Sequence, residues 1–388
     1  MKKIVIFGST GSIGSSLLKI IKKDKKNFNI VLLTANKNYK KIIKQAKIFH
    51  VKNIIIIDNI SFLVARKLLK NSKIKVFNNF DSLKKIFSKN KKVDYSMCAI
   101  SGFEGLKPTL DIIKNTKTIA IANKESIICG WNLIKKNLNK YKTKFIPVDS
   151  EHFSIWSLIN NDKRNNIEKI YITASGGPFR NLSLKKFKNI SIKDALKHPN
   201  WSMGKKISID SATMMNKVFE IIEAKKIFDL NYKQLEILTH PKSYLHAIVK
   251  FNNGLSKLLV HDTNMNIPIF NSIYLDSDKK IKSKKIDIKT LNNLDLKKVD
   301  KIRFPVVNIL KNINDKDSLF ETIIVSANDK LVNLFLCGKI KFTDISNNLL
   351  KICNMPQFTK FKSKKPKNID DINNLADYVS LKIEAMSV

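Results

Sequence analysis

The sequence predicts an α/β fold in three parts: an N-terminal parallel sheet covered by helices, a middle α+β part and a C-terminal helical part. Short β-branched runs alternate with amphipathic stretches as far as residue 148, mixed patterns follow to about residue 275, and helical periodicity dominates beyond residue 305. The chain has 388 residues, of which 43% are apolar, so it can bury the cores of two or three domains.

The first part alternates predicted strands with predicted helices. Apolar residues recur three and four apart in stretches such as 13–23 and 60–70, which is typical of helices that pack on a sheet. Because each helix carries the chain back across the sheet, the strands are expected to be parallel. The predicted strands are residues 4–7, 30–34, 54–57, 74–77, 95–100, 118–122 and 145–148.

The middle part mixes strands with a long helix. Strands are expected at 170–174, 235–239 and 245–251, and one helix from about 211 to 228. Residues 275–301 are polar and show little periodicity, which predicts a connection. Helices follow at 306–312, 327–336, 343–352 and 372–383. The predicted divisions are 1–150, 151–275, a linker at 276–305, and a helical domain at 306–388.

The net charge of +40 raises the question of nucleic-acid binding, since 72 Lys and Arg face only 32 Asp and Glu. Only four of these cations are arginines, and the lysines are spread along the whole chain. Arginine is the side chain that reads base edges with two hydrogen bonds. We therefore expect no specific nucleic-acid partner.

Apolar runs and cysteines indicate the compartment. No apolar run approaches the roughly 18 to 20 residues of a membrane helix, and only residues 4–7 form an apolar run before Gly8. The four cysteines lie far apart without metal-ligand spacing, which favours buried thiols in a reducing compartment. The sequence predicts a cytoplasmic protein with no membrane partner.

A glycine-rich turn is expected between the first strand and the first helix. Gly8, Gly11 and Gly14 occupy this turn, where glycine allows a sharp bend and brings backbone N–H groups up to a diphosphate. The spacing is a variant of the usual G-x-G-x-x-G, and a purely structural turn is the alternative. Its place at the head of the parallel sheet favours a Rossmann-like dinucleotide site.

The end of the second predicted strand indicates the type of dinucleotide. An NAD site usually carries Asp or Glu at this point, to bind the ribose 2′-hydroxyl. The strand here ends in Thr34-Ala-Asn-Lys-Asn38, without an acid. The sequence therefore favours NADP over NAD.

Carboxylates appear directly after the last predicted strand of the sheet. Asp149 and Glu151 stand two residues apart, and in extended backbone such residues share a face. An all-oxygen set of this kind suits Mg²⁺ or Mn²⁺. Taken alone, the triplet is more often a solvated loop than a metal site.

The long predicted helix of the middle part carries a polar stripe. Asn216, Glu220 and Glu223 recur at i, i+4 and i+7 among apolar residues. If this stripe is buried it must be paired or liganded, and the alternative is a face turned to water. Ser211, Lys217 and the turn that begins at Ser175 could bind a phosphate monoester.

Residues 198–204 form a non-repetitive segment that contains a tryptophan. A bare loop that exposes Trp201 to water is unfavourable, so this segment either packs permanently or closes over a substrate.

Several motifs together resemble those of the 1-deoxy-D-xylulose 5-phosphate reductoisomerase family. The resemblance runs in order from Lys3 to about Tyr378. It rests on Gly8-Ser-Thr-Gly-Ser-Ile-Gly14, Ala122-Asn-Lys-Glu-Ser126, Pro147-Val-Asp-Ser-Glu-His152, Thr173-Ala-Ser-Gly-Gly-Pro-Phe179, His198-Pro-Asn-Trp-Ser-Met-Gly204 and Asp210-Ser-Ala-Thr-Met-Met-Asn-Lys217.

The resemblance implies a role for each matching residue. The middle part would be the catalytic domain, with Asp149, Glu151 and Glu220 as metal ligands and Lys124, Glu151, His198 and Lys217 as catalytic residues. The substrate would contact Lys124, Ser150, Glu151, Ser175, His198, Trp201, Met203, Ser211, Asn216, Lys217 and Glu220. The cofactor would contact Thr10, Gly11, Ser12, Ile13, Lys37, Asn38, Asn123, Glu125 and Gly204.

The same resemblance implies the reaction and the partners. A homodimer would use NADPH and Mg²⁺ or Mn²⁺, with Co²⁺ as a further candidate, to convert the phosphorylated substrate into 2-C-methyl-D-erythritol 4-phosphate for non-mevalonate isoprenoid synthesis. Another NADP-dependent oxidoreductase of a phosphorylated sugar and a non-catalytic relative are the alternatives. Asn36, Val218, Phe219 and Asp329 depart from the family pattern.

Overall fold

The computed structural model describes residues 1–88, 92–159, 166–201, 203–275 and 277–386. Ser202 of the tryptophan segment, residue 276 at the start of the predicted linker, and residues 387–388 lie outside the described residues. The chain forms two compact units. The first comprises residues 1–126, 133–153 and 265–281, and the second comprises residues 127–132, 154–264 and 282–388.

The first unit contains the predicted parallel sheet. Its seven strands lie in the order β4-β3-β2-β1-β5-β6-β7, and every neighbouring pair is parallel. The central strands are buried because helices cover both faces, so they consist almost entirely of apolar residues. The strands are β1 (Lys2–Phe7), β2 (Phe28–Ala35), β3 (Asn53–Ile56), β4 (Lys75–Phe77), β5 (Val93–Cys98), β6 (Thr116–Ile121) and β7 (Lys144–Pro147).

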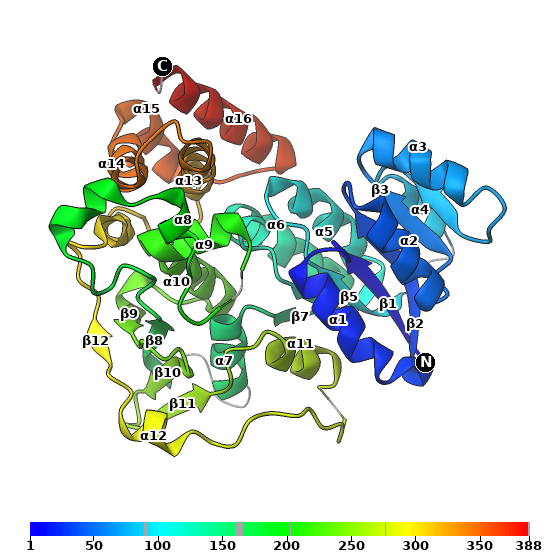
Figure 1. Cartoon of the computed structure of the whole chain (residues 1–388), viewed down its shortest axis with the longest axis horizontal. Coiled ribbons are helices and arrows are strands. Elements are labelled where there is room, and N and C mark those ends of the chain that lie inside the picture. The colour runs from blue at the N-terminus through cyan, green and yellow to red at the C-terminus, as the bar shows by residue number, and fades with distance from the viewer. Residues whose placement is uncertain (89–91, 160–165, 202, 276, 387–388) are drawn as a thin grey trace. The chain divides into compact units, whose positions relative to one another are not determined.

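Helices connect these strands, as the 3.6-residue periodicity predicts. α6 and α7 each cross the boundary between the two units. The helices are α1 (Ser12–Lys22), α2 (Tyr39–Ile48), α3 (Asn59–Leu68), α4 (Ser82–Ile86), α5 (Leu106–Ile113), α6 (Lys124–Tyr141), α7 (Ser150–Leu158) and α11 (Asn266–Ile273). The α/β fold class is confirmed for this part (Figure 1).

The turn between β1 and α1 requires glycine at two positions. Gly8 has a φ of +74°, in the left-handed region that favours glycine. A Cβ atom at Gly14 would lie 2.6 Å from the Cα atom of Ser9, which leaves no room for a side chain between α1 and the loop. The predicted reasons for these glycines, a sharp turn and close packing, are therefore observed.

The second unit contains a five-stranded sheet in the order β11-β10-β8-β9-β12. β8 and β9 are parallel and the other pairs are antiparallel. The sequence did not predict β11 or β12, because β11 is largely exposed and contains polar residues, and β12 is only two residues long. The strands are β8 (Ile167–Ala174), β9 (Leu235–Thr239), β10 (Leu245–Phe251), β11 (Ser256–Val260) and β12 (Lys297–Lys298).

Two helices replace the single helix expected from about residue 211. α9 (Lys205–Thr213) and α10 (Met215–Phe228) are separated by Met214, which has a φ of +71°. At this break the Thr213 hydroxyl bonds back to the carbonyl groups of Ile209 and Asp210 (3.2 Å each) and accepts the N–H of Met215 (3.3 Å). Ser211 therefore lies near the end of α9, where the sequence analysis placed it near a helix start.

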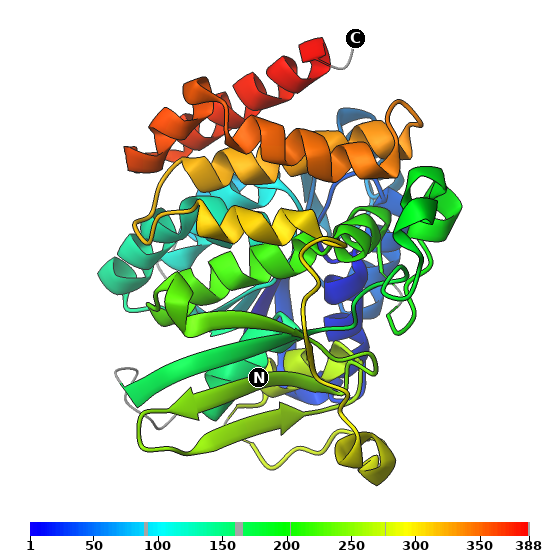
Figure 2. The same cartoon turned by 90° about the vertical axis from the view of Figure 1, so that its left-hand side faces the viewer.

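The C-terminal region is helical, as predicted, and packs in layers (Figure 2). α10 packs on β8 and β9, and the 3₁₀-helix Pro305–Lys311 packs on α10. α13 contacts α9, α14 and α16, and α16 is outermost. The helices are α8 (Ile192–Ala195), α12 (Ile288–Asn292), α13 (Phe320–Leu336), α14 (Phe342–Cys353), α15 (Pro356–Thr359) and α16 (Ile369–Met386). Further 3₁₀-helices are Lys25–Asn27, Phe103–Gly105, Leu184–Asn189, Tyr232–Gln234 and Lys360–Ser363.

The boundaries of the two compact units differ from the predicted domain boundaries. α11, assigned to the middle part, packs on α1 in the first unit. The hydroxyl groups of Tyr95 and Ser272 lie 2.8 Å apart, and Tyr274 donates to Asp24 at 2.9 Å. The predicted linker contains α12 and β12. The four-part division stays a prediction about function.

Two sequence expectations concern membranes and thiols. None of the helices in the described part of the chain has the length and apolar character needed to cross a membrane. Cys98, Cys129 and Cys353 are buried, as expected. Cys337, by contrast, is exposed, since it lies just beyond the last residue of α13. The sequence analysis did not expect this.

Candidate active site

The glycine turn of the first unit presents the start of α1. Gly11 is the N-cap of α1, and no described side chain caps this helix. Thr10, Ser12 and Ile13 flank it, so the sequence-predicted residues form one continuous stretch of loop and first helical turn. Backbone N–H groups at a helix start and the helix dipole favour an anion. The loop therefore has the form that a dinucleotide diphosphate requires.

Lys37 and Asn38 follow the neighbouring strand β2 at the same edge of the sheet. Asn38 caps α2 by accepting the N–H of Lys41 (3.1 Å), and the Lys37 side chain is exposed. The sequence analysis missed Lys41, whose Nζ donates to the Thr10 carbonyl oxygen at 2.8 Å. In so lysine-rich a chain, nothing in the sequence distinguishes this lysine.

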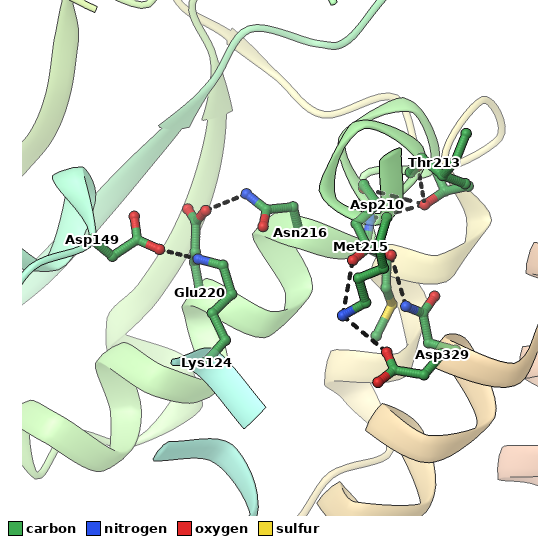
Figure 3. Close-up of polar contacts among 11 residues, drawn as sticks. Lys124, Asp149, Asp210, Thr213, Met215, Asn216, Glu220 and Asp329 are labelled. Atoms are coloured by element: carbon green, nitrogen blue, oxygen red, sulfur yellow. Dashed lines mark hydrogen bonds and ion pairs between the residues drawn. The ribbon is translucent and has the colours of Figure 1, made fainter. Parts of the chain in front are cut away.

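Asn123 and Lys124 begin α6 at the carboxyl end of β6. The Asn123 side chain caps α6 and donates to the carbonyl groups of Ile100 and Gly102, which follow β5. Lys124 forms an ion pair with Asp149, which follows β7 (Figure 3). Glu125 is buried in the first turn of α6. The ends of three neighbouring strands are thus joined by polar contacts.

The acidic triplet after β7 adopts a different backbone from the one expected. α7 begins at Ser150, so Asp149 and Glu151 are not two residues of one extended strand. Nevertheless, one carboxylate oxygen of Asp149 and one of Glu151 lie within 4.8 Å of each other. Ser150 donates to Glu151 at 2.6 Å. The two predicted metal ligands are therefore close together because they flank the first residue of α7, not because they share one face of a strand.

His152 adds a nitrogen atom to this cluster. It is fully buried, and one of its ring nitrogens lies within 4.8 Å of an Asp149 oxygen. The sequence analysis mentioned this histidine only as a neighbour of the triplet.

The polar stripe of α10 in the second unit is buried. Glu220 and Glu223 are each 1% exposed, so the alternative of a stripe that faces water is wrong. Glu220 accepts a hydrogen bond from the Asn216 amide (Figure 3). It also accepts one from the Lys217 ammonium group at 2.6 Å. The sequence spacing of i and i+4 placed Asn216 and Glu220 on one helical face, and in the structure their side chains are in contact.

The residues expected to bind phosphate gather around the end of α9. Ser175 Oγ accepts the N–H of Gly177 at 3.1 Å and lies 3.2 Å from His198 Nε2. The Gly177 backbone approaches so closely that a Cβ atom there would lie 2.9 Å from the Ser211 carbonyl oxygen. Arg180, which the sequence analysis did not single out, donates to the Ser175 carbonyl oxygen at 3.5 Å.

His198 is neutral in this environment. Burial, and then the positive charges of Lys217 and Arg180, lower the pKa of His198 to about 4. Its Nδ1 accepts the backbone N–H groups of Asn200 (3.2 Å) and Trp201 (2.9 Å). The proton of the neutral ring therefore belongs on Nε2, which can donate to Ser175.

The same histidine organises the tryptophan segment. Asn200 donates to the Pro241 carbonyl oxygen (2.7 Å) and to Ser243 (2.9 Å), and Trp201 packs edge-on against His246. Met203 is half-buried, and Gly204 is the exposed N-cap of α9. The segment is thus tied down at His198 and Asn200. Its role as a closing lid stays a prediction.

Three departures from the family pattern, at Asn36, Val218 and Phe219, lie in the described part of the chain, and the structure explains the one at Asn36. Asn36, where the family commonly has glycine, has no positive φ, so no glycine is required there. Val218 and Phe219 are fully buried on α10. The Lys206 ammonium group lies 5.3 Å from the centre of the Phe219 ring.

A glycine turn at the head of a parallel sheet and clustered carboxylates at its carboxyl edge define a class: dinucleotide-dependent enzymes with a site for a divalent metal ion. Family models identify the member of this class. The model of 1-deoxy-D-xylulose 5-phosphate reductoisomerase matches residues 4–130, that of its C-terminal domain matches residues 145–228, and a second C-terminal domain model matches residues 261–380.

Individual relatives agree with these models. The chain is 81% identical over 388 residues to the 1-deoxy-D-xylulose 5-phosphate reductoisomerase of Pelagibacter ubique, with both chains fully covered. It is 35% identical to that of Clostridium tetani, over 98% of this chain and 99% of the relative.

Solved structures show the same likeness. The reductoisomerase from Zymomonas mobilis in complex with NADPH has a TM-score of 0.88 at 30% identity, over 100% of this chain and 99% of the other. A reductoisomerase in complex with NADPH, fosmidomycin and magnesium has a TM-score of 0.90 at 30% identity, over 100% and 98%. The chain belongs to the 1-deoxy-D-xylulose 5-phosphate reductoisomerase family, so the predicted family and enzyme class are confirmed.

Proposed function

We propose that this protein uses NADPH and a divalent metal ion to rearrange and reduce 1-deoxy-D-xylulose 5-phosphate to 2-C-methyl-D-erythritol 4-phosphate in non-mevalonate isoprenoid synthesis. The observation that carries the proposal is the match to this family along the whole chain, with every residue assigned to chemistry present. The test is oxidation of NADPH by the purified protein with this substrate, with and without Mg²⁺ or Mn²⁺. A metal-dependent, branched product is expected.

The same assay separates the alternatives. Another NADP-dependent oxidoreductase would oxidise NADPH without forming a branched product. A non-catalytic relative would bind cofactor without turnover.

The first unit would hold the cofactor. The start of α1, which no described side chain caps, and the close packing of Gly14 of α1 against the loop at Gly8 and Ser9 fit a diphosphate site, and the edge of the sheet next to β1 is where the strand order reverses. Lys37 would meet the 2′-phosphate. Asn123, Glu125 and Gly204 would contact the remaining part of the cofactor. NADPH supplies a hydride when it is bound.

Replacing Lys37 with Glu is expected to weaken NADPH binding about tenfold and to change NADH binding little, since a carboxylate repels only the 2′-phosphate. Dissociation constants for both cofactors, measured by fluorescence titration, check this. Lys40→Glu, an exposed lysine on α2, is the control. Equal affinities for NADPH and NADH in the unmodified protein would contradict the assignment.

We assign the metal ion to Asp149, Glu151 and Glu220. Their donor atoms are carboxylate oxygens, the ligands that Mg²⁺ and Mn²⁺ prefer. A bound divalent ion polarises substrate oxygens. Lys124 and Lys217 each neutralise one of these carboxylates in the structure, so a cation must compete with an ammonium group at Asp149 and at Glu220.

The substrate phosphate would lie at the cluster around the end of α9. Ser175, Ser211, Asn216 and Lys217 would supply hydroxyl, amide and ammonium donors, and neutral His198 would donate through Nε2. Lys124, Ser150 and Glu151 would face the carbon chain. Trp201 and Met203 would exclude water when the segment closes.

We also propose a cytoplasmic homodimer. The edge strand β11 supports the dimer, because Leu258 on it and Leu255 just before it are about half exposed, and an uncovered apolar edge tends to pair with another chain. A monomeric mass in sedimentation equilibrium would contradict the dimer. Fractionation of cells that make the protein tests the compartment.

A further inference from the structure

A buried polar cluster lies outside the set of residues assigned to substrate, metal and cofactor. Asp210 of α9 is 2% exposed and accepts a hydrogen bond of 2.7 Å from the Asn328 amide of α13. Its second oxygen lies 3.2 Å from Lys206 Nζ, and the same Nζ lies 2.9 Å from Asp329. Figure 3 shows Asp210 and Asp329 in this cluster.

The cluster connects α13 to the helix that carries part of the substrate site. α9 begins at Lys205, immediately after the tryptophan segment, and Ser211 directly follows Asp210. The Gly177 turn packs against the Ser211 carbonyl group, and Lys217 lies one helical turn beyond the break at Met214. Any rotation or shift of the end of α9 would therefore move several of the residues assigned to phosphate.

The Asn328 side chain takes part in this cluster through its N–H group, not through its oxygen atom. A buried carboxylate is costly unless hydrogen-bond donors surround it, and Asp210 obtains one from its own helix and one from α13. The Asn328 side-chain oxygen is buried and has no hydrogen-bond partner among the described residues. The amide thus leaves one buried acceptor unsatisfied while it supplies a donor to Asp210.

We propose that Asn328 is a positioning residue for the phosphate side of the substrate site. By binding Asp210 it fixes the end of α9, and with it Ser211 and the start of α10. Asp329, which differs from the family pattern, contributes by holding Lys206 beside Asp210. The inference rests on the proposed function, because it takes the residues at the end of α9 as the phosphate site.

The test replaces the donor and then restores the hydrogen bond in reverse. Asn328→Leu removes the amide, Asn328→Asp places two carboxylates together, and the double variant Asp210→Asn with Asn328→Asp exchanges donor and acceptor. Asn333→Leu, an exposed asparagine on the same helix, is the matched control. The readouts are kcat and KM for the sugar phosphate, calorimetric binding of inorganic phosphate, NADPH affinity and Tm.

Asn328→Leu is expected to raise KM and the dissociation constant of phosphate about tenfold, because the end of α9 with Ser211 is no longer held in place, with kcat within about threefold and NADPH affinity unchanged. Asn328→Asp is expected to be worse, and the exchanged pair to recover phosphate affinity to within about threefold of the original. Asn333→Leu is expected to change none of these values.

A lower Tm with unchanged phosphate affinity in Asn328→Leu would show a merely structural role and overturn the inference. If that variant does not fold, the exchanged pair decides, and a tenfold loss of phosphate affinity in it would overturn the inference. Phosphate binding also separates the two proposals. An unmodified protein without turnover refutes the proposed function, and phosphate binding that still depends on position 328 keeps the positioning role.

Discussion

Replacing Glu220 with Gln is expected to lower turnover about 100-fold and to weaken metal binding in parallel, as expected for the loss of one ligand of a catalytic ion. Glu220 is buried on α10 and bonded to Asn216 and Lys217. Gln keeps the shape and removes the charge that offsets both the ion and the Lys217 ammonium group. Turnover against metal concentration, with NADPH affinity expected to be unchanged, is the measurement.

Glu223→Gln provides the control for this prediction. Glu223 is equally buried on the same helix, one turn further along, and is not assigned to the metal. It is expected to cost much less activity. A Glu220→Gln enzyme with normal metal dependence and near-normal turnover would remove Glu220 from the metal set.

Replacing Lys217 with Met is expected to raise KM for the sugar phosphate about 100-fold, because a buried ammonium donor to phosphate is lost. The metal dissociation constant is expected to fall, since the ammonium group 2.6 Å from Glu220 no longer competes with the cation. Substrate and metal affinity should therefore change in opposite directions. Steady-state kinetics and calorimetric titration with Mn²⁺ measure the two.

Lys225→Met, two turns further along α10, is the control, because Lys225 is bonded to the carbonyl group of Asp315 and has no role in the proposed site. It should leave both affinities unchanged. If Lys217→Met weakens metal and substrate binding together, the ammonium group supports the metal site and does not compete with it.

The parallel sheet could be predicted from the sequence because its strands are buried on both faces. Runs such as residues 54–57 are almost purely β-branched, and the helices between the strands have a clear period. β11 could not be predicted, since an exposed edge strand does not need an apolar pattern. The packing of α11 on α1 is a contact between distant parts of the chain, and local patterns do not contain it.

In the candidate site, too, local features could be predicted from the sequence and contacts between distant residues could not. The spacing of Asn216 and Glu220 placed them on one helical face, where the structure shows them hydrogen-bonded. The break at Met214 was missed because no glycine or proline marks it in the sequence of residues 205–228. Asn328 and Asp210 lie 118 positions apart, and neither carries a motif that would link them.

The left-handed residue Met214 has an electrostatic consequence. A continuous helix through residues 205–228 would engage its inner N–H groups in its own hydrogen bonds and would have no end near Lys217. The break creates a new helix start at Met215, inside the second unit, so the positive end of a fourteen-residue helix dipole lies beside Asn216 and Lys217. The left-handed conformation of Met214 costs about 1 to 2 kcal/mol. In return, the site gains a positive electrostatic potential from the helix N-terminus, which, unlike the charge of a lysine, does not depend on pH.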